Sequence, residues 1–211
     1  LAYFDQRSPR QRDFQPDIRK KLNRLGAPFE TWCLRDVPSI PNLHEIKFFI
    51  FATPWEITPE KAELLNRYVL NHDRTVLWFY APGISDGESF DESRIRRWTG
   101  ADPHVSGLSV QRMSGWTSAF LRNPAELTPA TLKSLAKSAG VHLYSDAEIP
   151  VYADDRFLAL HAKEGGTMTI RLPRRTGRIT ELFSGKLAAE NVSEFQWNFR
   201  APDTVLFEME D

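Results

Sequence analysis

Two continuous apolar runs with a helical segment between them constrain the fold of this chain most. The runs are "KFFIFATP" (residues 47–54) and "TVLWFYAP" (residues 75–82), and both are typical of strands buried on both faces. Between them, residues 58–73 place apolar side chains at helical spacing, with Thr58 as a cap and Pro59 at the first helical position. Two buried strands joined by one helix pair in parallel, so this stretch predicts a β-α-β unit.

The remainder of the first half repeats this alternation. Further strands are predicted over residues 1–4, 29–34 and 141–144, and further helices near residues 14–25, 91–100 and 128–140. Strands that alternate with helices through short connections form a parallel sheet between helical layers. We therefore predict an α/β domain, a three-layer sandwich, over residues 1–147.

Helical periodicity disappears from about Ile149 onward, and short strand-like segments separated by turn residues replace it. In one of them Phe195, Trp197 and Phe199 alternate with polar residues, which gives a strand one buried face. The turns fall at "DD", "EGG", "RRTG", "SGK" and "APD". This pattern predicts a small antiparallel β domain over residues 148–211.

Charge and composition exclude several classes of partner. The net charge is −1, without the basic excess of a nucleic-acid-binding protein. No apolar run approaches the roughly 20 residues that span a bilayer, so we expect neither a nucleic acid nor a membrane as a partner. The single cysteine, Cys33, excludes an internal disulfide and leaves the compartment undetermined. Because it lies in the predicted strand 29–34, we expect it to be buried as a small hydrophobic residue.

No metal or cofactor is predicted. The histidines are scattered and show no two-ligand spacing; they are His44, His72, His104, His142 and His161. No Gly-x-Gly-x-x-Gly sequence follows the first predicted strand, and no Walker motif is present.

The end of the apolar run 75–81 is where an open parallel sheet usually places its chemistry. The chain continues there through Pro82, Gly83, Ser85 and Asp86, without the Gly-x-Ser-x-Gly or Gly-x-Cys-x-Gly pattern of a nucleophile elbow. Ser85 is a candidate nucleophile, but no histidine lies nearby in the sequence, and a loop serine is ordinarily a turn residue. We predict no catalytic residue and interpret this loop as a vestigial site. The alternative left open is a small hydrolase or amidotransferase-like enzyme that uses it.

The same region is rich in acids, and a glycosidase requires two carboxylates that face each other. Asp86, Glu88, Asp91 and Glu92 follow one another closely, but nothing in the sequence distinguishes one of them as an acid. We interpret them as a solvated loop, with Asp91 capping the next helix.

Aromatic residues near the predicted strand ends offer a third function. Trp55, Tyr80 and Trp116 are candidates for stacking on sugar rings, as are Trp78 and Trp98 if they are exposed. A carbohydrate-binding module would need two or more of them exposed on one concave face.

The order of several motifs resembles glycoside hydrolase family 42 β-galactosidases. The motifs are "YFDQRS", "LGAPFETWCLRDV", "IKFFIFATPWEITPEKAELLNRYV" and "TVLWFYAPGISDG". They are similar to the middle, trimerisation domain of that family, which is amidotransferase-like (flavodoxin-like) in fold and lacks the amidotransferase nucleophile. The stretch "FLALHAKEGGTMTIRLPRRTGRITELFSGK", with Leu-Phe-Ser-Gly at residues 182–185, is similar to the small β-sandwich that follows this domain. Residues 100–127 resemble no part of the family.

This resemblance implies a non-catalytic accessory or oligomerisation fragment of a larger glycoside hydrolase that acts on carbohydrate. In the family a catalytic TIM barrel with two catalytic glutamates precedes the trimerisation domain; this sequence contains no barrel, and no catalytic residue is carried over. The sequence begins at Leu rather than Met, and we expect it to be a piece of a longer protein. The expected partners are the barrel of the parent chain and further copies of the same chain, with carbohydrate as a further candidate. The sequence does not indicate the substrate or the number of subunits.

Overall fold

The structure is a computed structural model that describes residues 17–211. The chain forms two compact units, neither of which is continuous in sequence. The first consists mainly of Thr31–Thr131 and Ser138–Gly140, and the second of Arg19–Glu30, Leu132–Lys137 and Val141–Asp211. Residues 19–30 thus group with the second half of the chain, although the sequence analysis placed them in the first domain. The predicted strand 1–4 lies outside the described residues.

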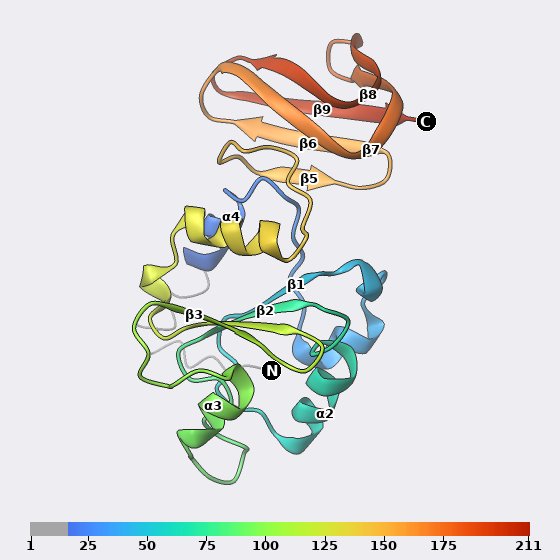
Figure 1. The fold of residues 1–211 in the computed structure, drawn as a ribbon. Helices are drawn as coiled ribbons and strands as arrows, with labels where there is room; N and C mark the ends of the chain where they lie inside the picture. Colours follow the sequence, from blue (N-terminus) through green and yellow to red (C-terminus); the bar gives the residue numbers. More distant parts are fainter. Residues whose placement is uncertain (1–16) are drawn as a thin grey trace. The chain divides into compact units, whose positions relative to one another are not determined.

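The first unit contains a four-stranded mixed sheet in the order β1-β2-β4-β3 (Figure 1). Its strands are β1 (Phe48–Phe51), β2 (Thr75–Phe79), β3 (Leu108–Arg112) and β4 (Thr117–Leu121). β1 pairs with β2 in parallel, and β2 pairs with β4 in parallel, whereas β3 is antiparallel to β4. The predicted β-α-β unit and the mixed α/β class are confirmed, but an all-parallel sheet is not.

The helices lie where the sequence predicts them. They are α2 (Pro59–Tyr68), α3 (Ser93–Thr99) and α4 (Pro129–Ser138), with the 3₁₀ turns η1 (Leu34–Ser39), η2 (Leu43–Glu45) and η3 (Pro124–Glu126). Residues 17–22 are also helical. The Thr58 hydroxyl accepts a hydrogen bond from the Lys61 N–H and so caps α2, as expected. α3 ends at Gly100, whose φ of 71° is the left-handed conformation that glycine adopts without strain.

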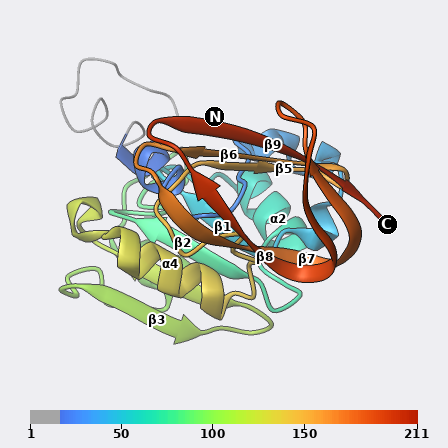
Figure 2. The ribbon, with the colours of Figure 1, turned by 90° about the horizontal axis from the view of Figure 1, so that it is seen from above.

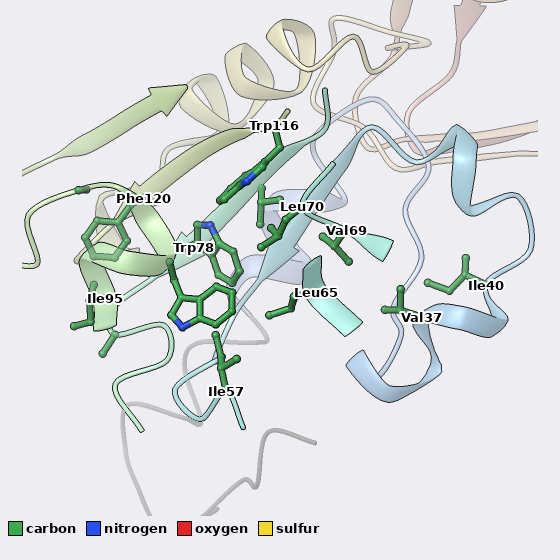
Figure 3. Close-up of a cluster of buried hydrophobic side chains, with 14 residues drawn as sticks. Val37, Ile40, Ile57, Leu65, Val69, Leu70, Trp78, Ile95, Trp116 and Phe120 are labelled. Carbon is green, nitrogen blue, oxygen red and sulfur yellow. The ribbon is translucent and has the colours of Figure 1, made fainter. Parts of the chain in front are cut away.

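Strand β2 is the centre of the first unit. Val76, Leu77, Trp78 and Phe79 are all fully buried, so both faces of this strand are covered, as predicted. Val76 and Trp78 belong to one cluster, together with side chains from α2, α3 and β4 (Figure 3). Strand β1 differs from the prediction: its residues 48–51 are only partly buried, because β1 has a neighbour on one side only in the described sheet.

Two predicted strands are wrong. Residues 29–33 are irregular and lead into η1, which contains Pro38 and cannot continue a sheet ladder. Cys33 lies in this irregular segment and is exposed rather than buried. Residues 141–144 form no strand. Their backbone is instead linked to residues 19–30 of the same unit, since the Tyr144 N–H donates to the Gly26 carbonyl at 2.8 Å.

The segment that matched nothing in the sequence analysis contains two strands. β3 and β4 lie within residues 100–127 and form a hairpin around Ser114 and Gly115. The Met113 N–H donates to the Trp116 carbonyl at 2.9 Å, and Gly115 has a φ of 81°. A Ser-Gly pair between two strands is a hairpin signal, and it was readable in the sequence.

The second unit contains a five-stranded antiparallel sheet in the order β5-β6-β9-β7-β8 (Figure 2). Its strands are β5 (Val151–Ala153), β6 (Phe157–Ala162), β7 (Gly166–Glu181), β8 (Lys186–Phe199) and β9 (Asp203–Glu210). The predicted antiparallel arrangement is confirmed, and so is the buried face at Phe195 and Phe199. The predicted turn at "RRTG" is wrong. β7 continues through it, with a register shift between Arg171 and Thr176 that accommodates Pro173.

Candidate functional site

The carboxyl ends of three parallel strands bring Trp55, Tyr80 and Arg122 together in the first unit. Tyr80 directly follows β2 and Arg122 directly follows β4, while Trp55 lies shortly after β1. The ring centroids of Trp55 and Tyr80 are 5.8 Å apart at an interplanar angle of 60°. The guanidinium carbon of Arg122 lies 5.5 Å from the centroid of the Tyr80 ring, within the range of a cation–π interaction.

Tyr80 has an unusual backbone conformation. Its φ is 62°, a left-handed value that is rare for a bulky residue without a short polar side chain. The residue is therefore strained at the strand end where a nucleophile elbow would place its catalytic residue. Sequence reasoning named Tyr80 only for its ring, because nothing in a Tyr-Ala-Pro-Gly sequence specifies a positive φ at the tyrosine.

The loop of residues 82–86, named here the 82–86 loop, is fixed by backbone hydrogen bonds to the segment after β1. The Gly83 N–H donates to the Pro54 carbonyl at 2.7 Å, and the Ser85 N–H donates to the Trp55 carbonyl at 3.0 Å. The Ser85 carbonyl in turn accepts from the Ile57 N–H at 2.9 Å. Each backbone N–H group of this loop has a carbonyl acceptor, so the loop is a paired structural element.

The Ser85 hydroxyl accepts a hydrogen bond from the Gly87 N–H at 3.1 Å, the geometry of a local serine turn. In the described part of the chain no histidine hydrogen-bonds to Ser85 or to Cys33. A serine or cysteine nucleophile needs such a base within reach.

Asp86 and Asp91 are held as carboxylates. Asp86 accepts from the N–H groups of Ser89 and Glu88, which lower its pKa, and it forms an ion pair with Arg94 at 2.5 Å. The hydroxyl and N–H of Ser93 lower the pKa of Asp91. Asp91 thus binds the first turn of α3, although the residue at the N-cap position itself is Glu92. A glycosidase acid needs a raised pKa, and the shift of both groups is in the opposite direction.

The structure separates the aromatic candidates. Trp78, Trp98 and Trp116 are buried, at 0%, 8% and 6% exposure, and the rings of Trp78 and Trp116 pack edge to face. All three belong to the buried cluster of the first unit, in which Figure 3 labels Trp78 and Trp116. Trp55 and Tyr80 are half-buried and lie side by side, so they are the aromatic pair that a ligand can reach.

Within residues 17–211, no three side chains of His, Cys, Asp or Glu gather closely enough to hold a metal ion. No helix in the same range has the length and apolar character that a membrane crossing requires.

Neither a family model nor a curated protein matches this sequence. Solved structures match it in fold. The β-galactosidase from Bacillus circulans sp. alkalophilus gives a TM-score of 0.66 at 13% identity, over 93% of this chain and 37% of that one. Gan42B, a GH42 β-galactosidase, gives a TM-score of 0.59 at 8% identity, over 100% of this chain and 38% of that one. Its catalytic mutant from G. stearothermophilus gives 0.57 at 9% identity, over the same shares.

The chain has the fold of a part of the GH42 β-galactosidases. The resemblance predicted from the sequence motifs is thereby confirmed at the level of fold. This chain spans little more than a third of each of these β-galactosidases. At 8 to 13% identity, the GH42-like fold carries no residue of their sites to this chain.

Proposed function

We propose that this chain is a non-catalytic accessory segment of a glycoside hydrolase, and that it contributes packing and subunit contacts to a larger β-galactosidase-like protein. The observation that carries the proposal is the paired 82–86 loop in a chain with a GH42-like fold. Its Ser85 has no base, and its Asp86 is committed to Arg94.

We propose further that the first unit is amidotransferase-like (flavodoxin-like). The parallel strands β1, β2 and β4 support this assignment, and so does the strained Tyr80 at the end of β2. A tyrosine at this position would mark an elbow that has lost its nucleophile. The proposed partners are a catalytic barrel of the parent chain and further copies of this chain.

Exposed apolar side chains on strand β3 offer a surface for the proposed contacts. β3 is an edge strand of the described sheet, and its Val110 and Leu108 are exposed at 51% and 37%. An edge strand with exposed apolar residues pairs readily with another chain. Phe183, in the turn between β7 and β8, is exposed at 70% and serves as the comparison site, because it lies on no strand. Tyr152 of β5 is also exposed, at 66%, but β5 is itself an edge strand.

Light scattering of the purified 211-residue chain tests this proposal. We expect self-association, or a complex with a separately produced parent barrel. Val110→Lys should weaken this association, and Phe183→Lys should leave it unchanged. We expect no hydrolysis of a chromogenic galactoside. Galactosidase activity that Ser85→Ala abolishes would overturn the proposal and restore the small-enzyme alternative.

A second candidate function, carbohydrate binding, is favoured by the Trp55–Tyr80 pair. Stacking on a sugar would change the fluorescence of Trp55, so a titration with galactose oligomers measures it. Tyr80→Asn removes the ring and retains a residue that tolerates a positive φ. If carbohydrate binds here, this variant loses the fluorescence change and Tyr152→Asn keeps it. An unchanged titration for Tyr80→Asn eliminates this candidate.

A further inference from the structure

A cavity of about 320 Å³ lies at the opposite, amino ends of β1 and β2 in the first unit. Lys47 directly precedes β1 and Arg74 directly precedes β2, and both line it. The Thr75 N–H donates to the Lys47 carbonyl at 2.9 Å, which fixes the two strand starts beside each other. The volume is at the lower end of the range of about 300 to 1,000 Å³ that small-molecule sites occupy.

Basic residues dominate the lining of this cavity. They are His44, Lys47, His72 and Arg74, and the one acid among the lining residues is Asp73. The Asp73 carboxylate is committed to an ion pair with Arg112. His72 and Asp73 also have positive φ values of 53° and 56°, so the wall they form has a defined and uncommon backbone conformation.

Among the described residues, no carboxylate balances the fixed positive charge of Arg74. Its side chain donates to the carbonyls of Ile46 at 3.0 Å, Leu43 at 2.8 Å and Tyr68, and to the side-chain oxygen of Asn71 at 3.0 Å. All four acceptors are uncharged. Arg74 is only 4% exposed, and burial lowers its pKa, which is the effect of a cation that lacks a counter-charge.

Lys47, which is exposed, adds a second positive charge beside Arg74. Its ammonium donates to the Gly140 carbonyl at 3.1 Å, and in residues 17–211 neither Lys47 nor Arg74 forms an ion pair with a carboxylate. A buried Arg74 charge that only neutral acceptors balance, with the Lys47 ammonium beside it, favours an anion in this cavity.

We propose that this cavity binds a phosphate group, either free or carried by a monosaccharide-sized ester. Lys47 and His72 contact the oxygens of the anion, and Arg74 provides the fixed charge behind them. This inference does not rest on the accessory function proposed above, because the cavity lies at the other end of the strands from Trp55 and Tyr80.

Amide chemical shifts of the full 211-residue chain test the proposal, with inorganic phosphate, glucose 6-phosphate and glucose as probes at constant ionic strength. We expect saturable shifts at Lys47, His72 and Gly140 with one or both phosphates and none with glucose. A response to inorganic phosphate alone identifies a site for the free anion, whereas a stronger response to glucose 6-phosphate identifies a site for an ester.

Lys47→Gln and Lys133→Gln form a matched pair of variants, because each lysine donates to one backbone carbonyl, Gly140 or Asp146. We expect Lys47→Gln to weaken phosphate binding about tenfold, the loss of one charge-assisted hydrogen bond, and Lys133→Gln to leave it unchanged. Equal affinities for the two variants, or wild-type shifts that do not saturate, would overturn the proposal. The amide chemical shifts of the wild-type chain show whether phosphate binds at Lys47, His72 and Gly140, even if a variant does not fold.

Discussion

The indole ring of Trp98 lies directly against the Cα of Gly83. A β-carbon at Gly83 would lie closer than 3.0 Å to ring atoms Cδ1 and Nε1, and Gly83 also has a φ of 64°. The conformation and the close approach both require glycine at this position. The Pro-Gly turn that opens the 82–86 loop is therefore explained by packing, without any catalytic function.

Replacing Gly83 by alanine should destabilise the chain by about 3 kcal/mol, since a left-handed alanine costs about 1–2 kcal/mol and the overlap with Trp98 adds to it. Gly107→Ala is the matched control, because Gly107 also has a positive φ of 72° but no atom within 4 Å of its β-carbon position. Chemical denaturation measures both. A cost for Gly83→Ala no greater than that for Gly107→Ala would contradict the contact with Trp98.

Arg74→Lys should lower the free energy of unfolding by about 2–4 kcal/mol, because a single ammonium cannot satisfy the oxygens that the guanidinium bonds. Arg112→Lys, at an exposed ion pair with Asp73, should cost at most about 0.5 kcal/mol. Urea unfolding compares the two variants. Equal stabilities would show that the carbonyls around Arg74 find other partners.

Glu181 gives a prediction for pH dependence. Burial opposes its ionisation, but the Ser184 hydroxyl and the N–H groups of Phe183, Ser184 and Leu206 together lower its pKa. Stability from a lowered carboxylate pKa is present above the ordinary pKa of glutamate and is lost as the pH falls through the lowered value. Glu181→Gln should therefore cost about 1–2 kcal/mol at neutral pH.

The same variant should converge with the wild type in acid, where Glu181 is protonated and its carboxylate acceptors are lost. Denaturation midpoints measured between neutral pH and strong acid follow this convergence. Glu190→Gln, at an exposed residue of β8, should run parallel to the wild type throughout. A difference between Glu181→Gln and wild type that grows as the pH falls would reverse the assigned sign.

Ser118→Ala should stabilise the chain by about 1 kcal/mol, because the Ser118 hydroxyl is fully buried and has no hydrogen-bond partner among the described residues. Ser145→Ala provides the contrast, since the Ser145 hydroxyl is equally buried but accepts from the Ala147 N–H at 3.1 Å. That variant should be destabilised by about 1 kcal/mol. Thermal unfolding distinguishes them, and a destabilised Ser118→Ala would reveal a partner for the hydroxyl.

Cys33 should react with a thiol reagent in the native chain about as fast as in denaturant, because it is exposed and lies in an irregular segment. The absorbance of the released chromophore gives both rates. If Cys33 reacted more than about tenfold more slowly in the native chain, a local opening step would be needed to reach it, which would contradict its exposure.

Local signals in the sequence predict much of this fold. The Thr-Pro starts of α2 and α4 are such signals, and so are the apolar run of β2 and the alternation at Phe195 and Phe199. The failures have a common origin. Residues 29–34 have the apolar composition of a strand. They are nevertheless irregular and largely exposed, and they lead into η1, which contains Pro38. β4 begins with Thr117 and Ser118, so its sequence lacks the continuous apolar run of a buried strand. It is buried because it lies between β2 and β3 in the sheet.

The candidate site could be predicted in part. The position of the 82–86 loop at a strand end follows from the order of the elements. The pairing of Trp55 with Tyr80, and the positive φ of Tyr80, depend on how three strand ends meet in space. The cavity at Lys47 and Arg74 is equally invisible in sequence, because 26 intervening residues separate its two cations.

The discontinuous second unit has a consequence for how the chain is made and cut. Residues 19–30 are synthesised early, but their partners in that unit, such as Tyr144 and Glu148, follow more than a hundred residues later. A nascent chain that ends before Val141 therefore exposes an unpaired early segment to chaperones. A protease that cuts once inside the first unit leaves fragments that remain associated, because the second unit draws residues from both sides of the cut.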